Sequence, residues 1–228
     1  GRPLSDFFPL MALWAQAHAR KYDINWCRQW GVHAQAARTA GALAFQLQKL
    51  AQSQGLQLEQ AGSLADDALR RCILIAFSDH LAAREDEGTL RCRLLHGRRG
   101  ELRRTSEVRH AKLLVAAEID EVQSRGDVTV LLSLATQIEP QWLEEYFPQD
   151  ISHTTQTAYD AVQKRVVCRR ERRFRDLVLE FKETTEAVPK GEAAELLSKE
   201  ISEGRIKLKE WDEGVERWIA RVNFAARA

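Results

Sequence analysis

The spacing of apolar residues changes once along this chain of 228 residues, and that change constrains the fold more than any other feature. Before the acidic turn at 86–88, apolar residues recur every three or four positions, which is the spacing of amphipathic helices. After the turn they alternate with a period of two, which is typical of strands with one buried face. In Thr89–His96, for example, Leu90, Cys92 and Leu94 share one face. The sequence therefore predicts a helical N-terminal part and a β-rich part after it.

Four helices are expected in the N-terminal part, over residues 7–18, 23–30, 33–51 and 64–84. Ser5 and Asp6 are residue types that cap a helix, so they are expected to begin the first one, and Ser63 the fourth. The third helix is rich in alanine and has an apolar stripe made of Ala36, Ala40, Leu43, Leu47 and Leu50. We predict that residues 1–84 pack into a small helical bundle.

The β-rich part contains strand-like runs at 89–96, 112–122, 127–138, 164–169 and 174–183. A short helix is expected from Pro140 to Pro148, before the last two strands. About five strands with one inserted helix match an OB-like barrel, which we predict over residues 85–188. Residues 189–228 are expected to form a C-terminal helical extension, with an apolar stripe of Trp211, Val215, Trp218, Ile219 and Val222. The predicted fold class is α+β.

Charge and composition exclude several classes of protein. The 34 basic residues nearly balance the 33 acidic ones, which excludes a uniformly basic nucleic-acid coat but not local basic patches. The apolar runs are too short to span a bilayer, and the N-terminus does not resemble a signal peptide. The four cysteines are widely spaced and form no C-x-x-C pair. They are expected to be reduced thiols in a cytoplasmic protein without a metal site.

Motifs of nucleotide hydrolysis and of common hydrolases are not found in the sequence. The segment Gly97–Gly100 is too short for a phosphate loop and lacks its lysine. The acidic pairs at 66–67 and 144–145 are interpreted as solvated helix faces. The sequence therefore predicts no catalytic residue and no bound cofactor in this chain, and a stand-alone enzyme is disfavoured.

Basic charge is concentrated in two clusters, one within residues 91–109 and one within 164–175, and thirteen of their fourteen basic residues are arginine. Guanidinium groups form paired hydrogen bonds with phosphate and stack on bases, which suits RNA. Alternatively, such arginines only solvate the outer face of a sheet or pair with nearby glutamates, and both interpretations remain open. The candidate nucleic-acid-binding residues are Arg98, Arg99, Arg103, Arg104, Arg169, Arg170, Arg172 and Arg173.

Several segments resemble a known family in the same order. Ser5–Leu10 (SDFFPL), Trp14, Asn25–Arg28 (NWCR) and the helix ending Gln46-Leu47 resemble the helicase-associated region of DEAH-box RNA helicases. Five further segments resemble the bacterial HrpB helicases within that family: Ala76–Ala82 (AFSDHLA), Leu94–Leu102 (LLHGRRGEL), Ala111–Asp120 (AKLLVAAEID), Gln163–Glu180 (QKRVVCRRERRFRDLVLE) and Trp211–Phe224. Each motif is weak alone, and the ordered set is specific.

The resemblance implies a ratchet-like helical domain followed by an OB fold, both packed on two RecA-like motor domains of the same parent chain. In the family the motor domains hold ATP and Mg²⁺, and the accessory domains close over single-stranded RNA during translocation. The expected partners are therefore single-stranded RNA or DNA and the motor domains, with no membrane. The start at Gly1 without Met is expected for an excised fragment. One departure is the third helix, where Arg38 and Lys49 replace the several arginines of the family's ratchet helix.

A second function class is a protein-interaction module. OB-like barrels and amphipathic helices also dock proteins, through the barrel or through the Trp211–Trp218 stripe. For the Trp211–Trp218 stripe, packing within this chain is favoured over docking of another protein.

Overall fold

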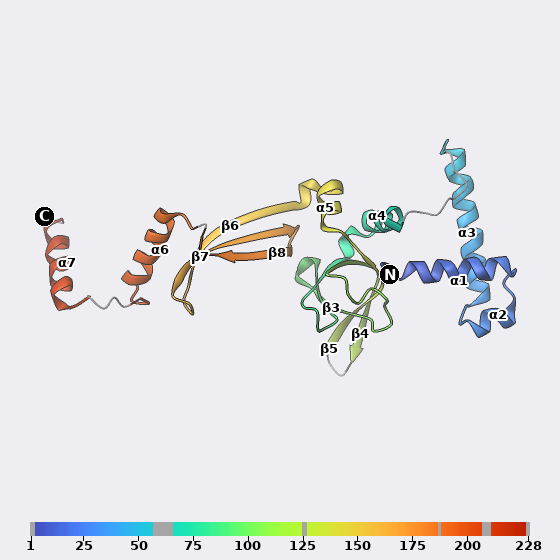
Figure 1. Cartoon of the computed structure of the whole chain (residues 1–228), viewed down its shortest axis with the longest axis horizontal. Helices are drawn as coiled ribbons and strands as arrows, with labels where there is room; N and C mark the ends of the chain where they lie inside the picture. Colours follow the sequence, from blue (N-terminus) through green and yellow to red (C-terminus); the bar gives the residue numbers. More distant parts are fainter. Residues whose placement is uncertain (1–2, 57–65, 125–126, 187, 207–210, 227–228) are drawn as a thin grey trace. The chain divides into compact units, whose positions relative to one another are not determined.

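The computed structural model describes residues 3–56, 66–124, 127–186, 188–206 and 211–226. Seven α-helices are described: α1 (Phe7–Ala19), α2 (Ile24–Gln29), α3 (Ala34–Ser53), α4 (Asp66–Ala76), α5 (Pro140–Tyr146), α6 (Lys190–Ser202) and α7 (Glu213–Ala225) (Figure 1). Eight strands are described: β1 (Leu81–Arg84), β2 (Arg91–Leu94), β3 (Arg99–Leu102), β4 (Leu113–Ser124), β5 (Asp127–Gln137), β6 (Ile151–Asp160), β7 (Arg165–Phe174) and β8 (Leu177–Thr184). The expected cap at Ser63 lies outside the described residues.

The predicted α+β class is confirmed, and the contacts divide the chain into two units. The first unit contains residues 1–151 and the short segment 174–177. The second unit contains residues 152–173 and 178–228.

A closed five-stranded barrel forms the centre of the first unit, in the order β1-β2-β3-β5-β4, with β4 pairing back to β1. Neighbouring strands are antiparallel except β3 and β5, which are parallel. The alternation predicted from sequence is confirmed, because Cys92 and Leu94 of β2 point into the core with Leu102, Leu114 and Leu132. The barrel is therefore OB-like and is complete at Gln137.

The extent of the barrel differs from the prediction over 85–188. All five barrel strands lie between Leu81 and Gln137, and α5 follows the last of them instead of preceding it. The runs expected to supply the final barrel strands form β7 and β8 of a separate three-stranded sheet, in the order β6-β7-β8. The prediction that both arginine clusters belong to one barrel is wrong for this reason.

Helix α4 is shorter than the helix predicted over residues 64–84. Ala76 is its last helical residue, and Leu81–Arg84 form β1 of the barrel. Leu81, Ala82 and Ala83 are all buried, so this strand shows no alternation of apolar and polar residues. α4 contacts β4 and β5 of the barrel, so it does not belong to a bundle with the first three helices.

Arg70 fixes α4 to the barrel and is 3% exposed. Its Nε donates to the carbonyl oxygen of Gln137 at 2.9 Å, and its two terminal nitrogens contact Asp67 and Glu139, each at 2.8 Å. The guanidinium also lies over the buried ring of Trp142, 4.8 Å from its centre. One side chain therefore joins α4, the end of β5 and the start of α5.

Asp6 fixes the start of α1 to the barrel, a role that differs from the helix cap predicted for it. Its carboxylate accepts hydrogen bonds from the backbone N–H groups of Glu107 and Ala135, each at 2.8 Å, and from the Ser106 hydroxyl at 3.1 Å. The first turn of α1 is instead capped by the Ser5 hydroxyl, which accepts from the Phe7 N–H at 3.2 Å. The Ser-Asp pair thus connects helix, loop and barrel strand.

Helices α1, α2 and α3 form a small cluster that is held by Trp14. The indole N–H donates to the Ala37 carbonyl oxygen at 2.8 Å. Where α3 crosses α1, the helix has Gly41, at which a Cβ atom would lie 2.6 Å from the Tyr22 hydroxyl and 3.1 Å from the Trp14 ring. The absence of a side chain allows this close crossing.

The predicted apolar stripe of α3 does not form the core of a bundle. Leu43, Leu47 and Leu50 are each more than half exposed, and α3 has no buried residue. The helix contacts α1 near Gly41, and its next three turns are exposed.

Gly41→Ala should lower the free energy of unfolding of the helical cluster by about 1–3 kcal/mol, because the new methyl group overlaps Tyr22 and Trp14. Helix propensity alone favours alanine by about 1 kcal/mol, so a loss of stability isolates the steric effect. The measurement is urea unfolding followed by tryptophan fluorescence. Gly191→Ala in α6 is the matched control, because nothing lies within 4 Å of its Cβ position. A stabilised Gly41→Ala variant would show that the crossing tolerates a side chain.

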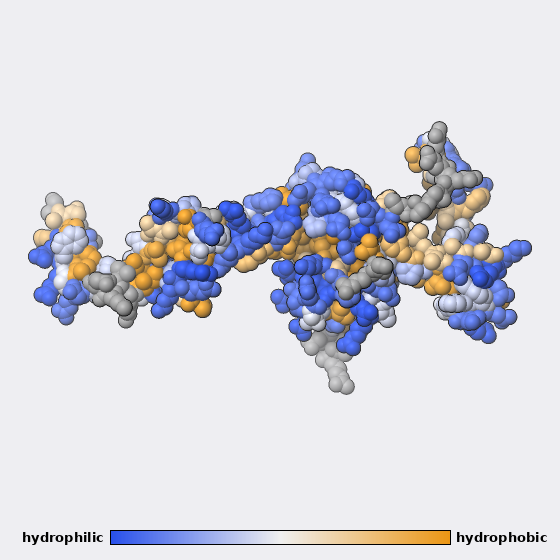
Figure 2. Space-filling view, in the orientation of Figure 1, coloured by the Kyte–Doolittle hydropathy of each residue, from blue (hydrophilic) through white to orange (hydrophobic). Residues whose placement is uncertain are grey.

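The second unit combines the β6-β7-β8 sheet with α6 and α7. The predicted packing of the Trp211–Trp218 stripe is not observed, since Trp211 is 41% and Trp218 60% exposed. Val222 and Phe224 are also exposed, and Figure 2 shows apolar surface over α6 and α7. Within the described ranges, no helix has the length and the apolar content needed to cross a membrane.

Candidate nucleic-acid interface

The first arginine cluster lies on the β2–β3 hairpin of the barrel. The turn between the strands contains His96 and Gly97 with φ of 61° and 65°, the left-handed backbone region. In the ladder, Arg91 lies opposite Glu101 and Arg93 lies opposite Arg99. Cys92 and Gly100 between them are buried, so the arginines face outward. The hairpin thus presents arginines from both strands on one outer face of the barrel.

A shallow cleft of about 280 Å³ lies beside this face and is lined by Arg91, Arg99, Thr129, Val130, Gly100, Glu85 and Glu101. Arg99 is 80% exposed and contacts Glu85 at 3.4 Å. Arg93 lies directly opposite Arg99 in the ladder, so two guanidinium side chains leave the barrel beside the cleft. The cleft combines guanidinium groups with a threonine hydroxyl, which are donors suited to phosphate oxygens.

Two other arginines of the cluster form ion pairs with β4. Arg98 contacts Glu121 at 2.8 Å, and Arg103 contacts Asp120 at 2.7 Å. Because β5 lies between β3 and β4 in the barrel, each pair links β4 to a residue next to β3 across β5. Arg104 and Arg109 are exposed, and no carboxylate in the described part of the chain pairs with either. The four predicted residues Arg98, Arg99, Arg103 and Arg104 therefore lie on one barrel, and three of them are paired.

Most of the second arginine cluster lies on β7 in the other unit, and three of its four candidate residues are paired with acidic residues. Arg169 contacts Glu183 at 3.0 Å and Arg172 contacts Glu180 at 2.7 Å, both on β8. Arg173 binds Glu171 of its own strand, with Nε at 2.9 Å. Arg170 is exposed and forms no ion pair with the residues described here. Of the two sequence interpretations, the solvated and paired sheet describes β7 better than the groove does.

The partners of the barrel arginines were not predicted from sequence. Asp120 and Glu121 lie in a run interpreted as a strand, and Arg98 and Arg103 lie about 20 positions earlier. Only the barrel order brings them together across β5. The available signal was the near equality of acidic and basic residues, which implies that many arginines have partners.

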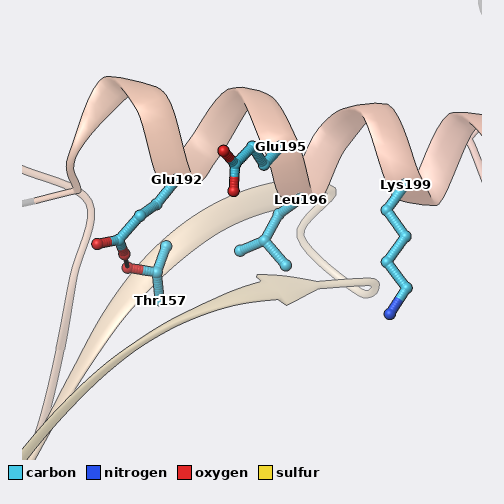
Figure 3. Close-up of a pocket in the computed structure, with 5 residues that line it drawn as sticks. All are labelled: Thr157, Glu192, Glu195, Leu196 and Lys199. Carbon is cyan, nitrogen blue, oxygen red and sulfur yellow. Dashed lines mark hydrogen bonds between the residues drawn. The ribbon is translucent and has the colours of Figure 1, made fainter.

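A second cavity, of about 300 Å³, lies between β6 and α6 in the other unit. Figure 3 shows Glu192 directed at Thr157 and Leu196 pointing toward the strands. The Thr157 hydroxyl donates a hydrogen bond to the Glu192 carboxylate. Glu195 and Lys199 complete the lining. The lining of this cavity is therefore one hydroxyl–carboxylate pair, one leucine and two further charged side chains.

The titratable groups elsewhere give no metal or redox site among the residues described. No three histidine, cysteine or acidic side chains there are grouped to hold a metal ion. The four cysteines are free, and burial raises the pKa of the Cys92 thiol to about 11, which keeps it protonated at neutral pH. His80 contacts the Ala116 carbonyl oxygen through Nδ1 at 3.0 Å, and His33 caps α3.

Comparisons with known proteins give matches among solved structures only. No protein-family model matches the chain, and no curated protein sequence matches it. The structure of the E. coli DExH-box NTPase HrpB is 18% identical, with a TM-score of 0.47, over 79% of this chain and 21% of that one. A structure of the Escherichia coli DEAH/RHA helicase HrpB is 18% identical, with a TM-score of 0.46, over 64% of this chain and 17% of that one. The chain therefore spans about a fifth of the length of these proteins.

Proposed function

We propose that this chain is an accessory region of an ATP-dependent RNA helicase of the HrpB-like DEAH-box type, and that its barrel binds single-stranded nucleic acid. The binding surface is the outer face of the β2–β3 hairpin with the arginines that follow β3. ATP and Mg²⁺ belong to RecA-like motor domains elsewhere in the parent chain, which acts in the cytoplasm. There the barrel and the N-terminal helices close the RNA channel over the motor.

The observation that carries this proposal is the outer face of the barrel. An OB-like barrel presents Arg91, Arg93 and Arg99 on two paired strands beside a cleft, with Arg104 exposed nearby. Five-stranded barrels of this type bind single strands on the same region. The ordered sequence motifs described above support the helicase context. Few aromatic residues accompany the arginines, so binding should depend on the phosphate backbone and tolerate any sequence.

The test is a salt titration with a labelled uridine oligonucleotide of about 12 nucleotides, followed by fluorescence anisotropy. Wild-type binding should weaken as salt rises, with a slope of log K against log[salt] of about −2 to −3, as expected for three or four phosphate contacts. The double variant Arg99→Glu/Arg104→Glu should raise Kd about tenfold or more, because it reverses charges on the proposed surface.

The matched control is Arg169→Glu/Arg170→Glu on β7, which changes the net charge by the same amount. We expect it to raise Kd by about threefold or less, because Arg169 is held by Glu183 and only Arg170 has no ion-pair partner in the described part. Absence of binding at low salt would contradict the proposed function. Equal losses in the two variants would show that net charge, not the barrel face, decides binding.

A second candidate function, docking of the motor domains, is favoured by the exposed face of α7. Trp218 is 60% and Phe224 81% exposed on this helix, and large exposed aromatic residues are common at protein interfaces. Co-purification of the chain with separately produced motor domains, lost on Trp218→Glu, would support this role. Unchanged co-purification of that variant would exclude α7 as the contact.

A further inference from the structure

Asp120 and Glu121 each contact one of the barrel arginines. Glu121 contacts Arg98 at 2.8 Å and Asp120 contacts Arg103 at 2.7 Å. Both carboxylates come from adjacent positions of β4, and both arginines flank β3, one just before it and one just after it. The two ion pairs therefore both link β4 to the ends of β3 across β5, and they leave β4 from opposite faces because neighbouring strand residues alternate.

All four side chains of these ion pairs are well exposed to solvent, between 39% and 61%. Exposed ion pairs are weak, because water and salt screen them and because ordering two long side chains has an entropic cost. A phosphate group can therefore replace a carboxylate on Arg98 or Arg103 without a large loss of folding stability. Because the ion pair has to break first, each such phosphate contact contributes less binding free energy than a contact with an unpaired arginine.

Two neighbouring arginines differ from Arg98 and Arg103 because they form no ion pair among the described residues. Arg104 and Arg109 have no carboxylate partner in the described part of the chain, so a phosphate reaches them without competition. The surface thus combines free arginines with arginines held by β4. Free arginines give the first contacts, and the held ones add affinity only when a ligand displaces Asp120 and Glu121.

We propose that Asp120 and Glu121 limit the affinity of the barrel for nucleic acid by competing with its phosphates for Arg103 and Arg98. This inference rests on the proposed nucleic-acid binding and names the residues that regulate it. Weak, easily reversed binding suits a surface that must release its strand repeatedly. Removal of the competing charges should therefore increase affinity, the opposite of the effect expected for ordinary surface substitutions.

The experiment measures Kd for the same labelled uridine oligonucleotide with the full chain and with Asp120→Asn, Glu121→Gln and the double variant. Each single substitution should lower Kd by about two- to fivefold, the range that corresponds to the strength of an exposed ion pair. The double variant should lower it by about tenfold. Glu107→Gln is the matched control, since this exposed acidic side chain lies in the loop between β3 and β4 and forms no ion pair among the described residues. It should change Kd by less than about 1.5-fold.

A double-mutant cycle with Arg98→Ala identifies the mechanism. In the Arg98→Ala background, Glu121→Gln should no longer lower Kd, because the arginine it would release is gone. The same gain in that background, or an equal gain from Glu107→Gln, would overturn the inference and leave only a net-charge effect. If wild-type binds and Arg98→Ala weakens binding while Glu121→Gln gives no gain, the inference fails and the proposed function stands. If neither wild-type nor the double variant binds, the proposed function itself fails.

Discussion

Asp6→Ala should lower the free energy of unfolding of the first unit by about 2–3 kcal/mol, because hydrogen bonds to a charged acceptor are stronger than neutral ones. The substitution removes three contacts at once, from Glu107, Ala135 and Ser106. The N–H groups of Glu107 and Ala135 then lose their acceptor. Urea unfolding gives the stability, and hydrogen exchange should show faster exchange at these two amides.

Asp6→Asn separates charge from shape, because it keeps the size of the side chain. One of its two terminal atoms becomes an NH₂ group and faces an N–H donor, so we expect about half of the loss. Asp23→Ala is the control: Asp23 makes a single local bond to the Trp26 N–H at 2.8 Å and caps α2. It should cost about 1 kcal/mol. If Asp6→Ala costs no more than this control, the junction does not depend on the carboxylate.

Asp6 also illustrates what local sequence patterns predict and what they do not. A Ser-Asp pair before an apolar run predicts a helix start, and α1 does begin there. The long-range contacts of Asp6 join residues about 100 positions apart, and no local pattern reports them. The capping bond comes from Ser5 instead, because the Asp6 carboxylate is engaged by the barrel.

The strands were predictable where one face is buried and one is exposed. β2 alternates in this way, and the limits of β4 and β5 lie within about two residues of those expected from sequence. β1 was read as helix because Leu81, Ala82 and Ala83 are buried on both faces. β6 was missed because Ser152–Gln156 is polar and exposed, which leaves no alternation to detect. The strand order places the two arginine clusters on different sheets, and it depends on pairing between strands that are distant in sequence.

The candidate site was predictable as a collection of arginines but not as a surface. Four of the eight predicted arginines, Arg98, Arg99, Arg103 and Arg104, lie in or next to β3, and the other four lie on β7. Which of the first four is held by a carboxylate depends on β4 lying two strands away from β3. The same holds for the β7 cluster, where β8 supplies partners to Arg169 and Arg172. Three of the four candidate arginines are paired in each cluster, so the cleft beside the barrel hairpin, and not pairing, distinguishes the two clusters.

Arg70→Met should lower the free energy of unfolding of the first unit by about 3–4 kcal/mol, since breaking a buried, hydrogen-bonded ion pair is strongly destabilising. Methionine fills a similar volume but leaves the Gln137 carbonyl oxygen without its donor and Glu139 without its cation. Trp142, which is 1% exposed, loses the guanidinium that covers its ring. Urea unfolding followed by tryptophan fluorescence measures the loss, and the environment of Trp142 should report it directly.

Arg71→Met is the control, because Arg71 is the next residue of α4 and lies over the same ring at 4.9 Å. It contacts Glu145 and the Tyr146 hydroxyl at 2.7 Å, but these groups are solvated, so its replacement should have a much smaller effect. Arg70→Lys keeps the charge but not the planar fork, so it should restore only part of the stability lost in Arg70→Met. Equal losses for Arg70→Met and Arg71→Met would show that stacking on Trp142, which both share, matters more than the buried contacts of Arg70. A larger loss at Arg70 would locate the stabilising energy of the α4–barrel junction in the bonds to Gln137 and Glu139.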